Sequence, residues 1–174
     1  LKKNNVEVIF GTGKLLSSKA DNKIVEVSTS DKNNINLQSS YVILATGAKS
    51  KDLPFVSSDG NNIWDYKSAM FPKKMPKSIV IVGSGAIGIE FASFFHSFGS
   101  DVTVVEVLNQ ILPVEDREIS ELAAKSFKEK GMTLHINTTV TNLEKNHGKV
   151  TATLDHGGGK SSQVTADRAI MAVG

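Results

Sequence analysis

The hydrophobic pattern in the second half of the chain predicts strands that alternate with helices. An apolar run at residues 78–82 leads into a cluster of glycines, and apolar residues then recur at helical spacing up to Gly99. A second strand is predicted over residues 101–106, a second helix ends at Gly131, and residues 132–136 repeat the strand pattern. Because the connections between these strands are short and helical, we expect parallel pairing with right-handed crossovers.

Each predicted helix carries an apolar stripe, which is the side on which we expect it to pack. The stripe of the first helix consists of Ile87, Phe91, Phe94, Phe95 and Phe98. The stripe of the second consists of Ile119, Leu122, Ala123 and Phe127.

After residue 136 the pattern becomes that of strands joined by turns. Residues 139–145, 149–155 and 162–174 have strand character, and turns are predicted at His147–Gly148 and at residues 157–159. This indicates an antiparallel excursion before a final buried strand. The stretch "GGGKSS" at 157–162 is similar to the end of a phosphate-binding loop, but Leu154 stands where that motif needs its first glycine. We interpret it as a hairpin turn.

The first part of the chain is predicted to form a β-meander. Strand patterns at residues 6–16, 23–30 and 35–47 are separated by polar turn clusters, and residues 41–45 are predicted to be a buried strand. Between residues 47 and 77, Pro54, Pro72 and Pro76 indicate a connector with one short ordered piece around residues 64–70. The predicted division is therefore 1–50, a connector at 51–77, and 78–174.

The composition is that of a globular protein, and it limits the kinds of partner and chemistry that we expect for the chain. The 174 residues are 40% hydrophobic and 22% charged, with a net charge of +2, which gives no reason to expect a nucleic-acid or membrane surface. The densest basic cluster, Lys73, Lys74 and Lys77, is interpreted as a solvated linker. No apolar run approaches the roughly 20 residues of a membrane span, and no apolar signal core precedes residue 12. The absence of cysteine excludes thiol redox chemistry by this chain.

The glycine cluster has the spacing of a dinucleotide-binding turn. Gly83 follows the strand and begins a tight turn, Gly85 allows a pyrophosphate to approach the helix start, and Gly88 allows the helix to lie close to the strand. Glu106 ends the next strand, 23 residues after Gly83, where a carboxylate can accept hydrogen bonds from a ribose. A 2′-phosphate would be repelled there, so the pattern predicts NAD. The alternative is that the glycines serve packing alone.

Other polar residues leave alternatives open or predict no site. Glu90, in the first turns of the first helix, is either an acid favoured by the helix dipole or a polar group aimed at a nicotinamide. The histidines at 96, 135, 147 and 156 lack metal-ligand spacing, so no metal site is predicted. The acidic run at residues 115–118 is interpreted as a charged helix start.

The sequence from Trp64 to Ser120 resembles the NAD-binding domain of the dihydrolipoamide dehydrogenase family, within the pyridine nucleotide-disulfide oxidoreductases, and especially its bacterial members. The stretches "FGTGKL" and "YVILATGAKSKDLP" resemble the second half of that family's FAD domain, and "ADRAIMAVG" resembles its return strand. The resemblance implies a Rossmann-like α/β domain with a parallel sheet, helices and an antiparallel meander, preceded by a partial FAD-domain β region.

Positions that match the family's motifs imply a set of cofactor contacts. The implied NAD loop and helix comprise Gly83, Ser84, Gly85, Ala86, Ile87, Gly88, Ile89 and Glu90. Glu106 is implied as the ribose ligand, Val140 as part of the adenine pocket, and Gly174 as a neighbour of the cofactor. The resemblance favours placing Glu90 beside nicotinamide and flavin. The implied FAD contacts are Gly13, Thr46, Gly47 and Ala48.

The implied activity of the family is oxidation of protein-bound dihydrolipoamide by NAD through FAD and a disulfide. Its partners would be lipoyl domains of a 2-oxo acid dehydrogenase complex and a second subunit, in a bacterial cytoplasm or, less favoured, a mitochondrial matrix. The family's FAD glycine motif, cysteine pair and acid–base histidine domain have no match here, so we expect a central piece that is inactive alone. Alternatives are an NADH oxidase or peroxidase type of flavoenzyme and a non-enzymatic nucleotide-binding module.

Overall fold

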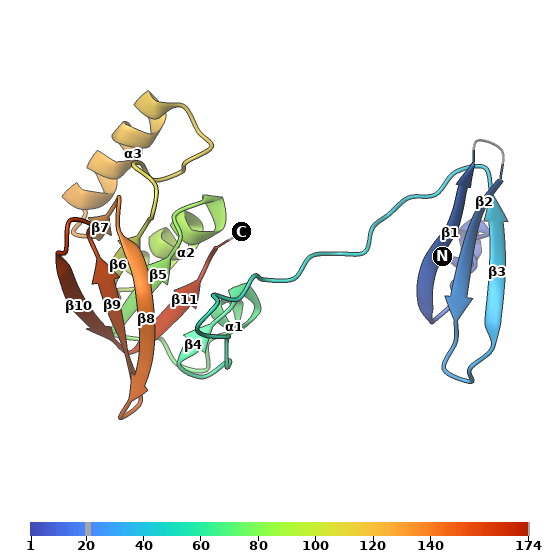
Figure 1. Cartoon of the computed structure of the whole chain (residues 1–174), viewed down its shortest axis with the longest axis horizontal. Helices are drawn as coiled ribbons and strands as arrows, with labels where there is room; N and C mark the ends of the chain where they lie inside the picture. The colour runs from blue at the N-terminus through green and yellow to red at the C-terminus, as the bar shows by residue number, and fades with distance from the viewer. Residues whose placement is uncertain (20–21, 174) are drawn as a thin grey trace. The chain divides into compact units, whose positions relative to one another are not determined.

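The computed structural model describes residues 1–19 and 22–173 and divides into two compact units, Leu1–Ala48 and Lys49–Gly174 (Figure 1). The first unit begins with a 3₁₀ turn, η1 (Lys2–Asn4), followed by strands β1 (Thr12–Lys19), β2 (Asn22–Ser28) and β3 (Asn34–Ser39). The strands pair antiparallel in the order β1-β2-β3, which confirms the predicted meander.

Two strand predictions in this unit are wrong. Residues 41–45 are irregular, and Tyr41, Ile43 and Leu44 are 88%, 90% and 72% exposed. The first strand begins at Thr12, so residues 6–10 are irregular as well. An apolar run becomes a buried strand only if a neighbouring strand pairs with it and a second layer covers it. The three paired strands of this unit offer neither to residues 41–45.

The second unit is built on a parallel sheet of five strands in the order β4-β11-β5-β6-β7. These strands are β4 (Ile63–Trp64), β5 (Ser78–Val82), β6 (Asp101–Val105), β7 (Thr133–His135) and β11 (Arg168–Met171). The predicted parallel pairing is confirmed. The strands β8 (Thr139–Asn146), β9 (Lys149–Asp155) and β10 (Ser161–Ala166) form the predicted antiparallel excursion.

Alternate residues of the parallel strands face two separate cores. Val80, Val82 and Val105 pack against the β8–β10 sheet, whereas Ile79 and Ile81 pack against the helices. This follows from the period of two in a strand, and it gives near-continuous apolar runs because both faces are covered. Figure 1 shows the β8–β10 sheet and helix α2 on opposite sides of the parallel sheet.

The helices are α1 (Tyr66–Met70), α2 (Ala86–Ser97) and α3 (Arg117–Glu129). Asp65 caps α1 by accepting from the Ser68 N–H, and Asp116 caps α3 by accepting from the Glu118 N–H. Among the described residues, no helix combines the length and apolarity that crossing a bilayer requires.

The predicted packing stripes of α2 and α3 are wrong in part. On α2 the buried residues are Gly88, Ile89, Ala92 and Phe95, while Ile87, Phe94 and Phe98 are 53%, 42% and 65% exposed. On α3, Ile119 and Leu122 are exposed, whereas Ala123 and Phe127 do pack on the core. Backbone approach sets the orientation of α2, because Gly88 must lie against the end of β5 and the residues four and seven positions later then face the sheet.

Residues 51–77, predicted as a connector, belong to the second unit and supply an edge strand of its sheet. The predicted short ordered piece corresponds to β4 and α1. One side chain organises the turn before β4, because the Asp59 carboxylate accepts hydrogen bonds from the N–H groups of Asn61, Asn62 and Ile63, each at 2.9 Å. The Lys145 ammonium lies 3.0 Å from the other carboxylate oxygen of Asp59.

Asp59→Ala is therefore expected to destabilise the chain by about 1–2 kcal/mol, since it removes several hydrogen bonds to a charged acceptor. Burial raises the pKa of Asp59, but the N–H donors and Lys145 outweigh it and hold the pKa at about 2 instead of the usual 3.8. The stabilisation is thus present above about pH 4 and lost as the pH falls through 2. Urea unfolding at several pH values measures both effects.

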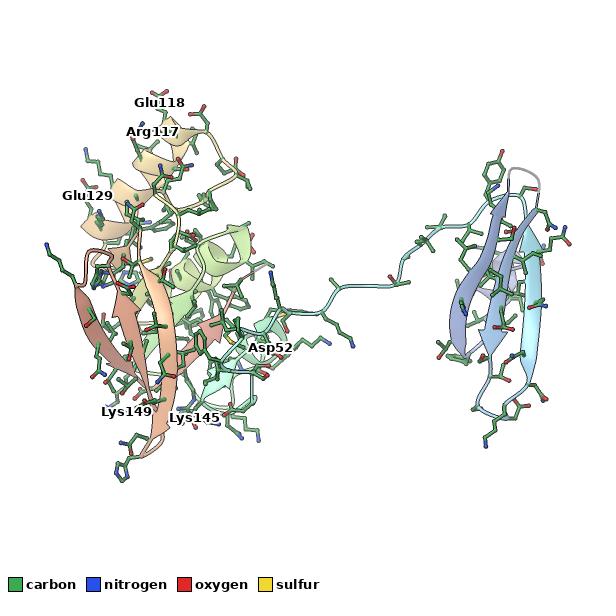
Figure 2. All side chains as sticks on the ribbon, viewed as in Figure 1. Asp52, Arg117, Glu118, Glu129, Lys145 and Lys149 are labelled. Atoms are coloured by element: carbon green, nitrogen blue, oxygen red, sulfur yellow. The ribbon has the colours of Figure 1, made fainter. Side chains whose placement is uncertain are left out.

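Asp52→Ala is the matched control, because the exposed Asp52 accepts one hydrogen bond, from the Ser58 N–H at 3.2 Å. Figure 2 labels Asp52 in the same segment. We expect Asp52→Ala to lower the free energy of unfolding by less than about 0.5 kcal/mol. Equal losses in the two variants would show that the Asp59 turn does not anchor β4.

Candidate functional site

A cavity of about 520 Å³ lies where β5 and β6 end. The turn after β5 contributes Gly83, Ser84 and Gly85, the end of β6 contributes Glu106, and β8 contributes Val140. In open parallel sheets, ligands bind at the carboxyl ends of the strands. The structure therefore brings these five predicted residues, far apart in sequence, around one space of ligand size.

The three glycines of the turn differ in what surrounds them. A Cβ on Gly83, whose φ is +99°, would lie 2.6 Å from the Ala172 carbonyl oxygen, and a Cβ on Gly88 would lie 2.1 Å from the Gly83 oxygen. These two positions are closed by the protein's own backbone. A Cβ on Gly85 would meet nothing within 4 Å, and this glycine is the N-cap of α2 without a side-chain hydrogen bond. The start of α2 is therefore open at Gly85.

The Glu106 side chain is buried and hydrogen-bonded within the protein, and only 5% of the residue is exposed. One carboxylate oxygen accepts from the Ser84 N–H at 2.8 Å and the Ser84 hydroxyl at 2.7 Å, and the other accepts from the Leu108 N–H at 2.9 Å. The carboxylate therefore ties the glycine turn to the loop after β6. Because each oxygen has two lone pairs, acceptor capacity remains for a ligand hydroxyl.

The other predicted NAD contacts differ in burial and in whether they line a cavity. Ser84 is fully buried and Val140 is 6% exposed. Ile89 is 7% exposed within the helix-side core, so its side chain lines neither this cavity nor the next. Ala86 is exposed at the start of α2. The predicted contact at Gly174 lies outside the described residues.

Glu90 and Ile87 line a second cavity, of about 400 Å³, beside the first turns of α2. Its other walls include Phe91 from the same helix and Tyr66 and Met70 from α1. Glu90 is exposed, and it does not line the cavity that contains Glu106. The first cavity includes the glycine turn and the second includes residues of the first helical turns, so both lie near the start of α2, and they share no lining residue.

Sequence reasoning missed several residues of the first cavity. Leu108, Pro113 and Val114 come from the loop after β6, and Thr138 precedes β8. Val114 is 88% exposed and Leu108 is 50% exposed, although both are apolar. The sequence contained a signal for these residues, because a loop that directly follows the carboxyl end of a parallel strand lies beside any ligand bound at that end.

The predicted FAD contacts lie in the first unit, and the structure shows no cradle around them. Gly13 lies in β1, while Thr46, Gly47 and Ala48 follow β3 in the irregular segment. All four residues are exposed. Gly47 has a φ of +78°, which is the one conformational requirement for glycine in this group.

The histidines do not assemble into a metal site in the part of the chain that the structure describes, where no group of three or more His, Cys, Asp or Glu could hold an ion. Burial and the neighbouring His156 lower the pKa of His135. His156 contacts the Thr138 hydroxyl at 3.2 Å and the Ser162 hydroxyl at 2.7 Å. The "GGGKSS" stretch forms the β9–β10 connection, with positive φ at residues 157–159, as the hairpin interpretation predicted.

A parallel sheet with a glycine turn, an uncapped helix start and a carboxylate at the end of the second strand defines an α/β domain of the Rossmann type. Residues 1–174 match the pyridine nucleotide-disulphide oxidoreductase family along their whole length. The chain belongs to this family.

Relatives and a solved structure agree with this assignment. The chain is 42% identical over 184 residues to a dihydrolipoyl dehydrogenase of Rhizobium etli, and 42% identical over 174 residues to one of Zymomonas mobilis. All of this chain is covered in both cases, but only 38% and 36% of the relatives' own lengths. The crystal structure of LpdA from Mycobacterium tuberculosis superposes with a TM-score of 0.84 at 27% identity, covering 99% of this chain and 37% of LpdA.

Proposed function

We propose that this chain is the NAD(H)-binding portion of a dihydrolipoyl dehydrogenase. The observation that carries the proposal is the open position at Gly85, with Glu106 in the same cavity. Closed contacts at Gly83 and Gly88 hold the turn in place, while the free space at Gly85 leaves room for a pyrophosphate at the helix start. The 42% identity to dihydrolipoyl dehydrogenases supports the choice of activity.

Glu106 is the proposed ribose ligand and the source of selectivity for NAD. Its charge would repel a 2′-phosphate, and Arg117, the first basic residue after β6, pairs with Glu121 at 2.7 Å instead. Figure 2 labels Arg117 at the start of α3. The apolar residues Val140 and Leu108 would enclose the adenine.

The nicotinamide half would lie in the second cavity, which is lined by Ile87 and Glu90. NAD, when bound, supplies hydride-acceptor chemistry there. The apolar walls from Phe91 and Tyr66 would keep water from the reacting ring, and the exposed Glu90 carboxylate would orient polar groups at its edge. No residue of this chain is assigned as catalytic.

In the whole enzyme, NAD would oxidise dihydrolipoamide through FAD and a disulfide, with lipoyl domains and a second subunit as partners. This chain has no cysteine, so the disulfide must come from outside it, and we expect the chain alone to be inactive towards dihydrolipoamide. Its proposed FAD contacts are limited to the exposed positions Gly13, Thr46, Gly47 and Ala48. A flavoenzyme of the NADH oxidase or peroxidase type is not favoured, because the 42% identical relatives are dihydrolipoyl dehydrogenases.

Titration calorimetry of the chain with NADH and NADPH tests the proposal. We expect one NADH to bind with a roughly micromolar dissociation constant, and NADPH to bind at least about tenfold more weakly. Unfolding monitored with and without each cofactor provides the control for folded protein, since only a ligand of the native state raises the midpoint. Absence of NADH binding by the folded chain, or a preference for NADPH, would contradict the assignment.

A further inference from the structure

Basic side chains from three separate stretches of the second unit gather at one surface. Lys73, Lys74 and Lys77 come from the segment before β5, Lys149 from the start of β9, and Arg168 from the start of β11. We call these five residues the basic patch. From the sequence alone, the three lysines before β5 are interpreted as a solvated linker. Lys149 and Arg168 lie far from them along the chain, so nothing in the sequence indicates that the five residues gather.

Two adjacent cavities run along the basic patch and share Lys74 and Arg168. The larger, of about 400 Å³, adds Lys77 and Lys149 to these two cations. The smaller, of about 190 Å³, adds Lys73 together with Phe71 and Trp64. Because the cavities share two residues, they adjoin and together form a groove, with the aromatic side chains in its smaller part.

Most of the positive charge in this groove is uncompensated. Asp167 is the one carboxylate that lines either cavity, and it already accepts the Lys77 backbone N–H at 2.8 Å. The ion pairs among the described residues involve Arg117, Lys125 and Lys145, and none includes a lysine of the basic patch.

The cations of the basic patch differ in how firmly they are placed. The Arg168 guanidinium donates to the carbonyls of Gly148 and Asp167 and lies 5.7 Å from the centre of the Trp64 ring. It is therefore fixed before any partner binds. The four lysines are exposed, and Figure 2 shows Lys149 at the lower end of the β8–β9 hairpin. One ordered cation among several adaptable ones suits a partner with several carboxylates along an extended backbone.

The basic patch lies at the end of the sheet opposite to the nucleotide cavity. Lys77 directly precedes β5 and Arg168 begins β11, whereas Gly83 follows the carboxyl end of β5. The parallel pairing of β5 with β11 puts both amino ends at the same edge. A ligand in the groove would therefore leave the nucleotide cavity free.

We propose that the basic patch docks an extended acidic segment of a partner protein. The distribution of the cations over two adjoining cavities favours a chain of carboxylates over a compact phosphate, which needs convergent donors at one point. Phe71, 81% exposed in the smaller part of the groove, offers an apolar contact beside the charges. Individual surface ion pairs contribute little, so affinity arises from several pairs together and falls with added salt.

Fluorescence anisotropy with a labelled peptide of about ten glutamates tests this in dilute salt. The charge-reversed chain Lys74→Glu/Lys77→Glu/Lys149→Glu is expected to bind the peptide at least about tenfold more weakly than the parent. The control chain Lys128→Glu/Lys130→Glu/Lys160→Glu carries the same change of net charge on exposed lysines elsewhere, and should lose less than about threefold. Circular dichroism establishes that both variants are folded.

Three results would overturn the proposal. The first is failure of the parent to bind the peptide at low salt. The second is an equal loss of affinity in the two variants, which would show that net charge alone attracts the peptide. The third is tighter binding of tripolyphosphate or an oligothymidylate than of the peptide, with the same dependence on the basic patch, which would assign the groove to a small anion or to nucleic acid.

Discussion

Gly88→Ala is expected to destabilise the chain by about 3 kcal/mol and to abolish measurable NADH binding. The new Cβ would lie 2.1 Å from the Gly83 carbonyl oxygen and 3.3 Å from the Ala172 side chain, so α2 must move away from the end of β5. Overpacking of this kind typically costs about 1–3 kcal/mol, and backbone atoms cannot rotate aside as a flexible side chain can. Urea unfolding measures the loss of stability, and calorimetry the loss of binding.

Gly85→Ala is the matched control for Gly88→Ala. It adds the same methyl group to the glycine turn where no protein atom is close, so it tests contact with the ligand without disturbing the packing of α2. No atom of the protein lies within 4 Å of the added Cβ, and the backbone at φ −63° and ψ 179° suits alanine. Stability should change by less than about 1 kcal/mol. NADH affinity should still fall at least about tenfold, because the methyl group occupies the space proposed for the pyrophosphate. Unchanged NADH affinity in this folded variant would rule out close approach of a pyrophosphate at Gly85.

The glycine turn also explains which parts of the fold could be predicted from sequence. Strand positions followed from apolar runs, because strands covered on both faces are apolar throughout. The buried side of α2 did not follow from its largest apolar residues. A backbone contact at Gly88 selects Ala92 and Phe95 for the core and leaves Phe94 and Phe98 on the surface. Such a contact has no hydrophobic signature in the sequence.

Features that depend on pairing between strands far apart in the sequence could not be predicted from the sequence either. The two residues of β4 pair with β11, so the place of the predicted connector in the sheet depends on a strand near the end of the chain. The basic patch likewise arises from that pairing and from the β8–β9 hairpin. In contrast, Gly83, Gly85 and Glu106 could be found because the motif and its spacing specify local geometry at the ends of two adjacent strands.

Three internal hydrogen bonds to Glu106 change what its substitution should do. A carboxylate that faces a crevice and has no partner within the protein can be removed with little harm to the fold. The structure shows that Glu106→Ala leaves the Ser84 N–H, the Ser84 hydroxyl and the Leu108 N–H without their acceptor. Leaving buried donors unsatisfied costs about 1–3 kcal/mol each, partly relieved by water in the cavity. We expect a loss of about 2–4 kcal/mol in stability.

Ser84→Ala is the control for this structural role. It removes the hydroxyl donor but keeps the charge of Glu106, and the Ser84 N–H remains bonded. Stability should fall by about 1 kcal/mol, and the ratio of NADPH to NADH affinity should stay as in the parent.

That affinity ratio is the measurement that a purely structural role of Glu106 would not change. Glu106→Ala should weaken NADH binding by about 10- to 100-fold, since charge-assisted bonds to the ribose contribute about 1.5–3 kcal/mol each. NADPH should lose less affinity or gain some, because removal of the charge relieves repulsion of the 2′-phosphate. Glu106→Gln, which keeps the shape and one acceptor oxygen, should shift the ratio in the same direction with a smaller loss of stability. If both folded variants bind the two cofactors in the parent's ratio, Glu106 only holds the glycine turn, and selectivity for NAD must come from another residue of the cavity.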